Sequence, residues 1–240
     1  MSTFIQLCVD AQRECDIVGT EIAAVTDQTG ELARIVNWVK QAWTEIQNRH
    51  SSGPYWKWMR SVFTVQTVAS DDTYAGTDCT DSRLAATITR FARWWEFDDR
   101  GYSNVKIYLT SAGVGTEHEM SFMDWASFRQ LYKRGTQNNG YPAHYTIDPQ
   151  NNLVLGPKPD AIYTVSGEYQ MSAQVLAANS DTPECPSQFH QLIVYGAMRK
   201  YAGFESAPDV MSRAVVEGNK LMRQLEANQL PQITIAPPLC

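Results

Sequence analysis

The sequence predicts an α+β protein in which the N- and C-terminal segments form a helical bundle and the middle of the chain forms a β-rich insertion. Near both ends, apolar residues recur at three- and four-residue spacing, which is the period of an amphipathic helix. The middle is rich in Val, Ile, Thr and aromatic residues with partial alternation, which fits strands. We expect four parts, namely N-terminal helices (residues 1–54), the β-rich insertion with one helix (55–182), C-terminal helices (183–229) and an extended C-terminal segment (230–240).

The N-terminal part predicts two helices. Residues 4–16 place Phe4, Leu7 and Ala11 on one face, and residues 31–50 carry a longer apolar stripe. Thr29 is a suitable N-cap for the second helix. The breaker cluster Ser-Ser-Gly-Pro at residues 51–54 ends this part.

In the middle part, strands are expected within residues 58–68, 83–97 and 104–111. A helix is expected at residues 121–135, because Ser121 and Asp124 are spaced as a capping box.

A hairpin and a further strand follow. The hairpin consists of residues 145–147, a turn at 148–152 and residues 153–155. Pro157 and Pro159 lack the amide that a sheet ladder requires, so the link after the hairpin should lie at an edge or in a loop. Residues 161–173 are expected to form the last strand.

The C-terminal part predicts helices at residues 186–205 and 206–229. The first contains Gly196 and Gly203, small residues that allow another backbone to approach closely, and the second begins with the N-terminal signature Ser206, Pro208, Asp209.

Composition and charge limit the function classes. The chain has 240 residues and a net charge of -6, which argues against tight binding to nucleic acid because phosphate affinity comes from Lys and Arg. No stretch approaches the roughly 20 apolar residues of a membrane span, and the N-terminus does not resemble a signal peptide. The five cysteines are scattered, which indicates reduced thiols of a protein made in a cytoplasm.

No motif indicates catalysis. Residues 113–119, GVGTEHE, lack the third glycine of a dinucleotide fingerprint and are more typical of a hairpin turn. Glu117, His118 and Glu119 offer one histidine and two carboxylates, too few for a metal site without a further ligand. The other histidines stand alone, and no serine lies in a G-x-S-x-G elbow. We therefore predict no enzyme and no catalytic, cofactor-binding or metal-binding residues.

Two tryptophan pairs are the interface candidates. Their rings could act as base-stacking platforms beside Lys57, Arg60 and Arg93, but core or interface packing is favoured in an acidic chain. The residues are Trp56, Trp58, Trp94 and Trp95.

Three stretches carry a resemblance to one family. They are QTGELARIVNWVKQAWTEIQNRHSSGPYWKWMR, IDPQNNLVLGPKPDAIYTVSGEY and TPECPSQFHQLIVYGAMRKYAGFESAP, followed by an amphipathic helix. In this order they resemble the head-to-tail adaptor (connector) proteins of tailed bacteriophages. The resemblance implies a structural protein of the virion neck that forms a homo-oligomeric ring, commonly a dodecamer, under the portal protein. The ring extends the channel through which DNA passes without specific binding, and it presents a surface to the tail.

In such rings the C-terminal segment often docks onto the portal, and residues 230–240 suit that role. The docking candidates are Pro231, Ile233, Ile235, Pro237, Pro238 and Leu239. Two alternatives stay open, namely a tail-completion or tail terminator protein, which would contact tail protein instead of portal, and a phage tail-associated enzyme.

Overall fold

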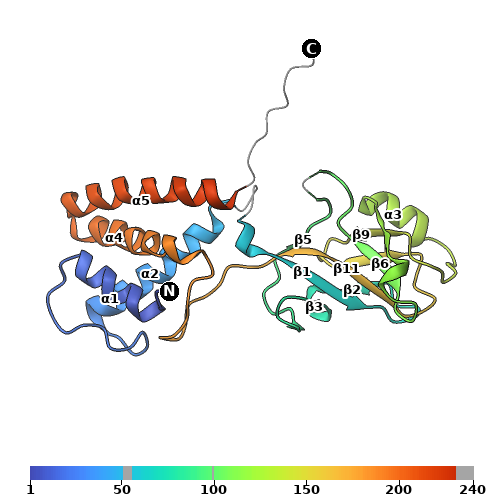
Figure 1. Cartoon of the computed structure of the whole chain (residues 1–240), viewed down its shortest axis with the longest axis horizontal. Helices are drawn as coiled ribbons and strands as arrows, with labels where there is room; N and C mark the ends of the chain where they lie inside the picture. The colour runs from blue at the N-terminus through green and yellow to red at the C-terminus, as the bar shows by residue number, and fades with distance from the viewer. Residues whose placement is uncertain (51–55, 99, 231–240) are drawn as a thin grey trace, which may run out of the picture. The chain divides into compact units, whose positions relative to one another are not determined.

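The chain divides into two compact units in the computed structural model, which describes residues 1–50, 56–98 and 100–230 (Figure 1). One unit, which we call the helical unit, combines Met1–Trp58 with Ala173–Cys240. The other, which we call the β unit, is Met59–Ser172. The middle of the chain thus folds by itself, and the two ends fold together.

In the helical unit, three helices are arranged around α4 (Gln191–Glu205). They are α1 (Phe4–Glu14), α2 (Gly30–Asn48) and α5 (Pro208–Gln229). Helix α4 contacts each of the other three, and Figure 1 shows α5 on one side of it and α1 and α2 on the other. This position requires apolar residues around much of its circumference, and the run Leu192, Ile193 and Val194 is buried accordingly.

Helix α4 approaches α2 closely at Gly196. A Cβ atom built on Gly196 would lie 2.7 Å from the Cβ of Ala42, which is closer than two such atoms can approach. Glycine is therefore required at this crossing. The returning chain is also bound to α2, because Gln47 accepts a hydrogen bond from the amide of Gln174 (2.6 Å) and donates one to its carbonyl (3.0 Å).

The β unit contains two sheets and one α-helix, α3 (Trp125–Tyr132). The first sheet has the order β4-β3-β1-β11-β6-β7, with β5 paired to β11, and the second has the order β2-β10-β9-β8. The strands are β1 (Arg60–Gln66), β2 (Thr73–Tyr74), β3 (Thr80–Asp81), β4 (Ala86–Thr87), β5 (Arg93–Trp94), β6 (Lys106–Leu109), β7 (His118–Glu119), β8 (Ser121–Phe122), β9 (His144–Ile147), β10 (Leu153–Gly156) and β11 (Tyr163–Gln170).

The first and last strands of the β unit pair with each other over their length. Strands β1 and β11 are antiparallel, with a register that runs from Arg60 opposite Gln170 to Gln66 opposite Thr164. Both sheets contribute to one apolar core, in which Phe63, Ile107 and Tyr145 are buried. The β unit therefore has its own apolar core, and its first and last strands are hydrogen-bonded to each other.

The carboxylate of Asp81 is buried in the β unit. Burial raises the pKa of Asp81, but hydrogen bonds from Tyr169, the backbone amides of Leu84 and Arg83, and Ser61 lower it by more, so that the net shift is downward. The carboxylate thus stays charged inside the unit and joins β3 to β1 and β11.

The predicted fold of a helical bundle with a β-rich insertion is wrong. The described residues do form an α+β structure, with five α-helices and two sheets, but they separate into two units with separate cores. The other helices from the two ends of the chain each pack against α4, so α4 is central and the four helices do not have equivalent positions. The physical reason is the β1–β11 pairing, which satisfies the strand edges within residues 59–172 and makes that segment a unit of its own.

Individual elements agree with the sequence to different degrees. The predicted hairpin is confirmed as β9 and β10, and the GVGTEHE stretch forms part of the turn after β6 and includes β7, which pairs with β6. The helix expected at residues 121–135 is shorter: Ser121 belongs to β8, and Asp124 is the N-cap, its carboxylate accepting from the amide of Ser127 (3.0 Å). Residues 83–97 contain only the two short strands β4 and β5.

Two glycine substitutions in α4 test the helix crossing. Gly196→Ala should lower the free energy of unfolding by about 1 to 3 kcal/mol, because the new methyl group overlaps Ala42. Gly203→Ala is the matched control: no atom lies within 4 Å of its added Cβ, so it should stabilise by up to about 1 kcal/mol. Urea denaturation followed by circular dichroism measures both. Equal effects of the two substitutions would contradict the close crossing.

Candidate functional site

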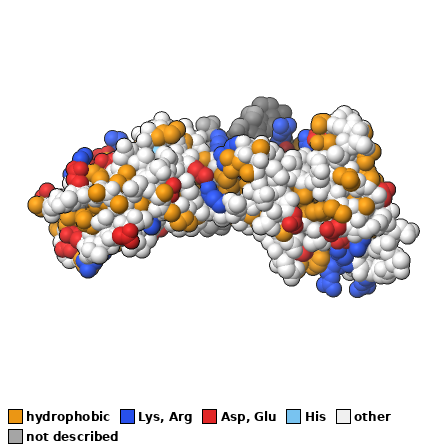
Figure 2. All heavy atoms as spheres, turned by 90° about the horizontal axis from the view of Figure 1, so that it is seen from below, with side chains coloured by type: hydrophobic (Ala, Val, Ile, Leu, Met, Phe, Trp, Pro, Cys, Tyr) orange, Lys and Arg blue, Asp and Glu red, His pale blue; other side chains and the backbone are white. Residues whose placement is uncertain are grey.

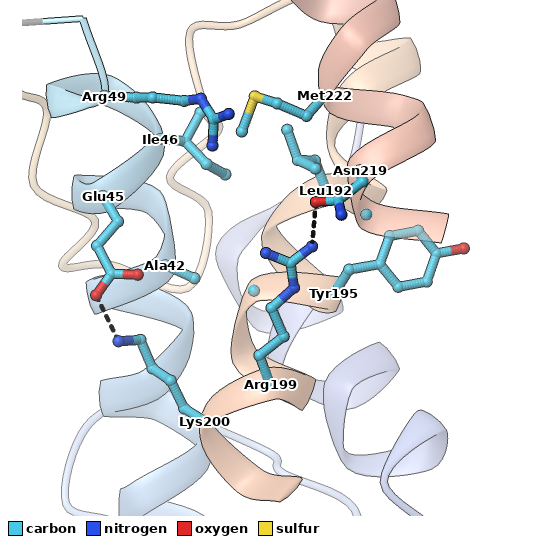
Figure 3. Close-up of a pocket in the computed structure, with 12 residues that line it drawn as sticks. Ala42, Glu45, Ile46, Arg49, Leu192, Tyr195, Arg199, Lys200, Asn219 and Met222 are labelled. Atoms are coloured by element: carbon cyan, nitrogen blue, oxygen red, sulfur yellow. Dashed lines mark hydrogen bonds and ion pairs between the residues drawn. The ribbon is translucent and has the colours of Figure 1, made fainter. Parts of the chain in front are cut away.

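A pocket lies in the helical unit between α2, α4 and α5 (Figure 3). It has a volume of about 340 Å³. Its apolar floor is formed by Ile46 of α2, Leu192 of α4 and Met222 of α5, and charged side chains stand at its rim. Because all three helices pack within one unit, the pocket is part of a single compact body.

Arg199 is positioned in the pocket by a glycine of the neighbouring helix. A Cβ on Gly218 would lie 2.8 Å from a guanidinium nitrogen of Arg199, so a larger residue there would displace the guanidinium from its present place against α5. The guanidinium donates hydrogen bonds to the side-chain oxygen of Asn219 (2.9 Å) and, at 3.4 Å, to the carbonyls of Ala214 and Val215. Figure 3 shows it pointing across the pocket to Asn219.

The rim of the pocket carries three basic side chains, of which two are paired with carboxylates. Lys200 pairs with Glu45 (2.5 Å), and Arg49 pairs with Glu226 (3.0 Å). Within residues 1–50, 56–98 and 100–230, Arg199 has only neutral partners. Burial lowers the pKa of Arg199, and the charge of Arg49 lowers it further. An incoming carboxylate would therefore find one cation that no described carboxylate neutralises.

The first tryptophan pair lies in the helical unit. The rings of Trp56 and Trp58 are stacked with centroids 4.7 Å apart, and Trp58 also stacks on Trp43 at 6.4 Å. Trp56 is buried, and its indole nitrogen donates to the carbonyl of Ile46 (2.8 Å). Trp58 is half-buried, and in the described structure its indole nitrogen has no hydrogen-bond partner.

The second pair lies in the β unit. Trp94 is buried against Phe63, and its indole nitrogen donates to the carbonyl of Asn151 (3.0 Å). Trp95 is half-buried, with the guanidinium of Arg60 4.2 Å from its ring centroid. In both pairs one ring belongs to a core and the other reaches the surface, so the interface hypothesis depends on Trp58 and Trp95 and stays a prediction.

The predicted docking segment cannot be placed in the structure. Pro231, Ile233, Ile235, Pro237, Pro238 and Leu239 all lie outside the described residues.

The described part of the chain offers little for catalysis. Its four cysteines, Cys8, Cys15, Cys79 and Cys185, are buried, and burial raises the pKa of each thiol to about 12, far from the thiolate that a nucleophile needs. Glu117, His118 and Glu119 are exposed on and beside β7, and the described residues contain no group of metal-ligating side chains. Among these residues, no helix combines the length and apolarity needed to cross a bilayer.

Sequence reasoning missed the pocket. Its residues come from three helices, and their only local signal is a glycine in a helix interior, Gly218, beside the polar Asn219. Such a glycine costs helix stability and therefore suggests a packing requirement. The side chain that occupies this space, Arg199, comes from another helix, so no local pattern around Gly218 identifies it.

Comparison with known proteins gives a family for the whole chain. The family model described as SU10 adaptor protein matches residues 2–235, which include both units. No curated protein matches the sequence. The family match confirms the resemblance to head-to-tail adaptors that the sequence predicted.

The free energy of unfolding of two variants tests whether Arg199 is structural. Arg199→Met should change it by no more than about 1 kcal/mol, because methionine keeps the packing of the aliphatic stem and removes a cation that lacks a carboxylate partner. Lys200→Met is the matched control and should cost about 0 to 1 kcal/mol through its exposed pair with Glu45. A loss well above 2 kcal/mol in Arg199→Met alone would assign the guanidinium to fold stability instead of binding.

Proposed function

The chain belongs to the SU10 adaptor protein family, and we propose that it forms a ring between the capsid portal and the tail of a bacteriophage. The observation that carries the proposal is the family match across residues 2–235, which leaves neither unit outside it. In this place, the protein extends the DNA channel of the virion neck and provides the surface to which the tail attaches. The role is structural and needs no catalytic step.

The ring requires that one surface of each copy bind a different surface of the next. Such heterologous contacts close into a ring when the rotation between neighbours divides a full turn, as it does in the proposed dodecamer. Partly exposed aromatic side chains are enriched in interfaces of this kind. Trp58 in the helical unit and Trp95 in the β unit are therefore our candidates for contacts with neighbouring copies, portal or tail.

The C-terminal segment provides a contact with the portal in this proposal. Pro231, Pro237 and Pro238 disfavour helix and central strand, and apolar residues at 233, 235 and 239 are spaced by even numbers. This pattern suits an extended segment laid in a groove of a partner. The buried apolar area has to offset the conformational entropy that the segment loses on docking.

DNA passes through the ring without being held. Each copy carries a net charge of -6, and a ring repeats this charge around the channel. On the face shown in Figure 2, one group of Lys and Arg side chains gathers at the lower right, and elsewhere Lys and Arg occur among Asp and Glu, without a continuous basic stripe. A ring of acidic subunits does not bind the phosphate backbone of DNA tightly. Weak binding allows the genome to pass through the channel.

A C-terminal deletion tests the portal contact. Removing residues 231–240 should leave circular dichroism and melting unchanged, because the described helices and strands of both units lie within residues 4–229. The deletion should abolish association with portal rings of the same phage. Native mass spectrometry of portal mixtures measures the association. The full-length chain is the control and should add several copies per portal ring.

A triple substitution in the C-terminal segment tests whether its apolar side chains, and not only its length, are needed for association with the portal. Replacing Ile233, Ile235 and Leu239 by Ser keeps all residues but removes the apolar anchors, and should weaken association nearly as much as the deletion. If the deleted protein still bound portal rings, the docking role of the segment would be refuted, whereas failure of the full-length chain to bind would refute the portal position itself.

DNA affinity of the purified protein is a separate prediction. At physiological salt, where charges are screened beyond about 8 Å, we expect no measurable binding to duplex DNA. Fluorescence anisotropy of a labelled duplex measures it. Tight binding that weakens steeply with salt would instead favour the stacking-platform interpretation of the tryptophans.

A further inference from the structure

The loop between α1 and α2 presents an apolar side chain on a fixed backbone. Val18 is 94% exposed at its tip, and Gly19 follows with a φ of 145°, a conformation that other residues rarely adopt. The buried side chain of Gln12 holds the loop from inside: it donates to the carbonyl of Thr20 (3.1 Å) and accepts from the amide of Ile22 (3.2 Å). A loop held in this way loses little entropy on binding.

The same loop carries a carboxylate that has no partner. Asp16 lies two residues before Val18 and is exposed, and within the described ranges its side chain makes no hydrogen bond or ion pair. Of the other acids between α1 and α2, Glu21 is paired with Arg13 (2.6 Å), and Asp27 lies farther along the chain from Val18. Val18 and Asp16 thus place an apolar group and a negative charge close together.

The pocket of the helical unit offers the complementary features. Its apolar floor includes Met222 and Leu192. At its rim Arg49 and Lys200 are paired with carboxylates, while Arg199 has only neutral partners in the part of the chain that the structure describes. A volume of about 340 Å³ exceeds that of a valine side chain and leaves room for the backbone on either side.

The apolar and charged groups of the loop and of the pocket match each other, which indicates that the pocket binds the loop of a second copy of the chain. Val18 is exposed, so the loop does not fill the pocket of its own chain. Loop and pocket belong to the same compact unit but to different surfaces of it, because neither α1 nor the loop lines the pocket. Contact between two different surfaces of identical copies is heterologous and repeats from copy to copy, as a ring requires.

We propose that residues 16–21 of one copy dock in the pocket between α2, α4 and α5 of the next, with Val18 on the apolar floor and Asp16 beside Arg199. The inference rests on the proposed ring and specifies the contact that joins its subunits.

Thiol cross-linking of the full chain tests the contact. In a Cys240→Ser background, the Val18→Cys, Met222→Cys double variant should give a ladder of covalent oligomers with a short bismaleimide, because each copy carries one thiol at each surface. The four buried native thiols, with pKa values of about 12, should not compete. A mixture of the two single variants should stop at dimers.

A matched control uses another exposed valine of the helical unit. Val216 on α5 is 62% exposed, and Val216→Cys in place of Val18→Cys should give no ladder. Charge reversal adds a second readout: Asp16→Arg or Arg199→Asp alone should lower the cross-linking yield about tenfold or more, and the two together should restore it. Melting curves show that each variant is folded.

The outcomes separate this contact from the ring itself. Rings of normal size by native mass spectrometry, with no ladder and no effect of charge reversal, would overturn the loop contact and leave the ring intact. If the pocket variants lost portal or tail binding while ring size was unchanged, the pocket would belong to that partner and the inference would be wrong. Absence of any ring, even with portal present, would overturn both proposals.

Discussion

The antiparallel pairing of β1 with β11 is the constraint on which the rest of the structure depends. These strands are the first and last of the β unit, and their register sets Arg60 opposite Gln170, while the amide of Met171 donates to the carbonyl of Met59 (2.7 Å). The chain therefore enters and leaves the β unit at one place. Residues before 59 and after 172 then start from neighbouring points, which allows the two ends of the chain to build a single helical unit.

Glycines set the helical unit's finer geometry. Gly196 lets α4 approach α2, and Gly218 makes space for the guanidinium of Arg199 against α5. Both positions cost intrinsic helix stability, which the close packing offsets. The result is an apolar pocket with one cation, Arg199, that has no carboxylate partner among the described residues. Under the proposed assembly, such a surface would serve contact with another protein more than the stability of the fold.

The sequence was informative where local periodicity decides structure. The β9–β10 hairpin and the helices at both ends were predicted because spacing and turn residues specify them locally. The division into two units depends on a strand pair separated by about a hundred residues, which no local pattern reveals. The pocket was missed for the same reason, since it exists only after three helices pack.

Electron microscopy of the intact neck of the phage tests the central claim most directly. The account predicts a closed ring of this chain with one side on the portal and the other on the tail, and with DNA or an open channel through its centre. Density for this chain only at the end of the tail tube, away from the portal, would contradict the account and favour a tail-completion protein.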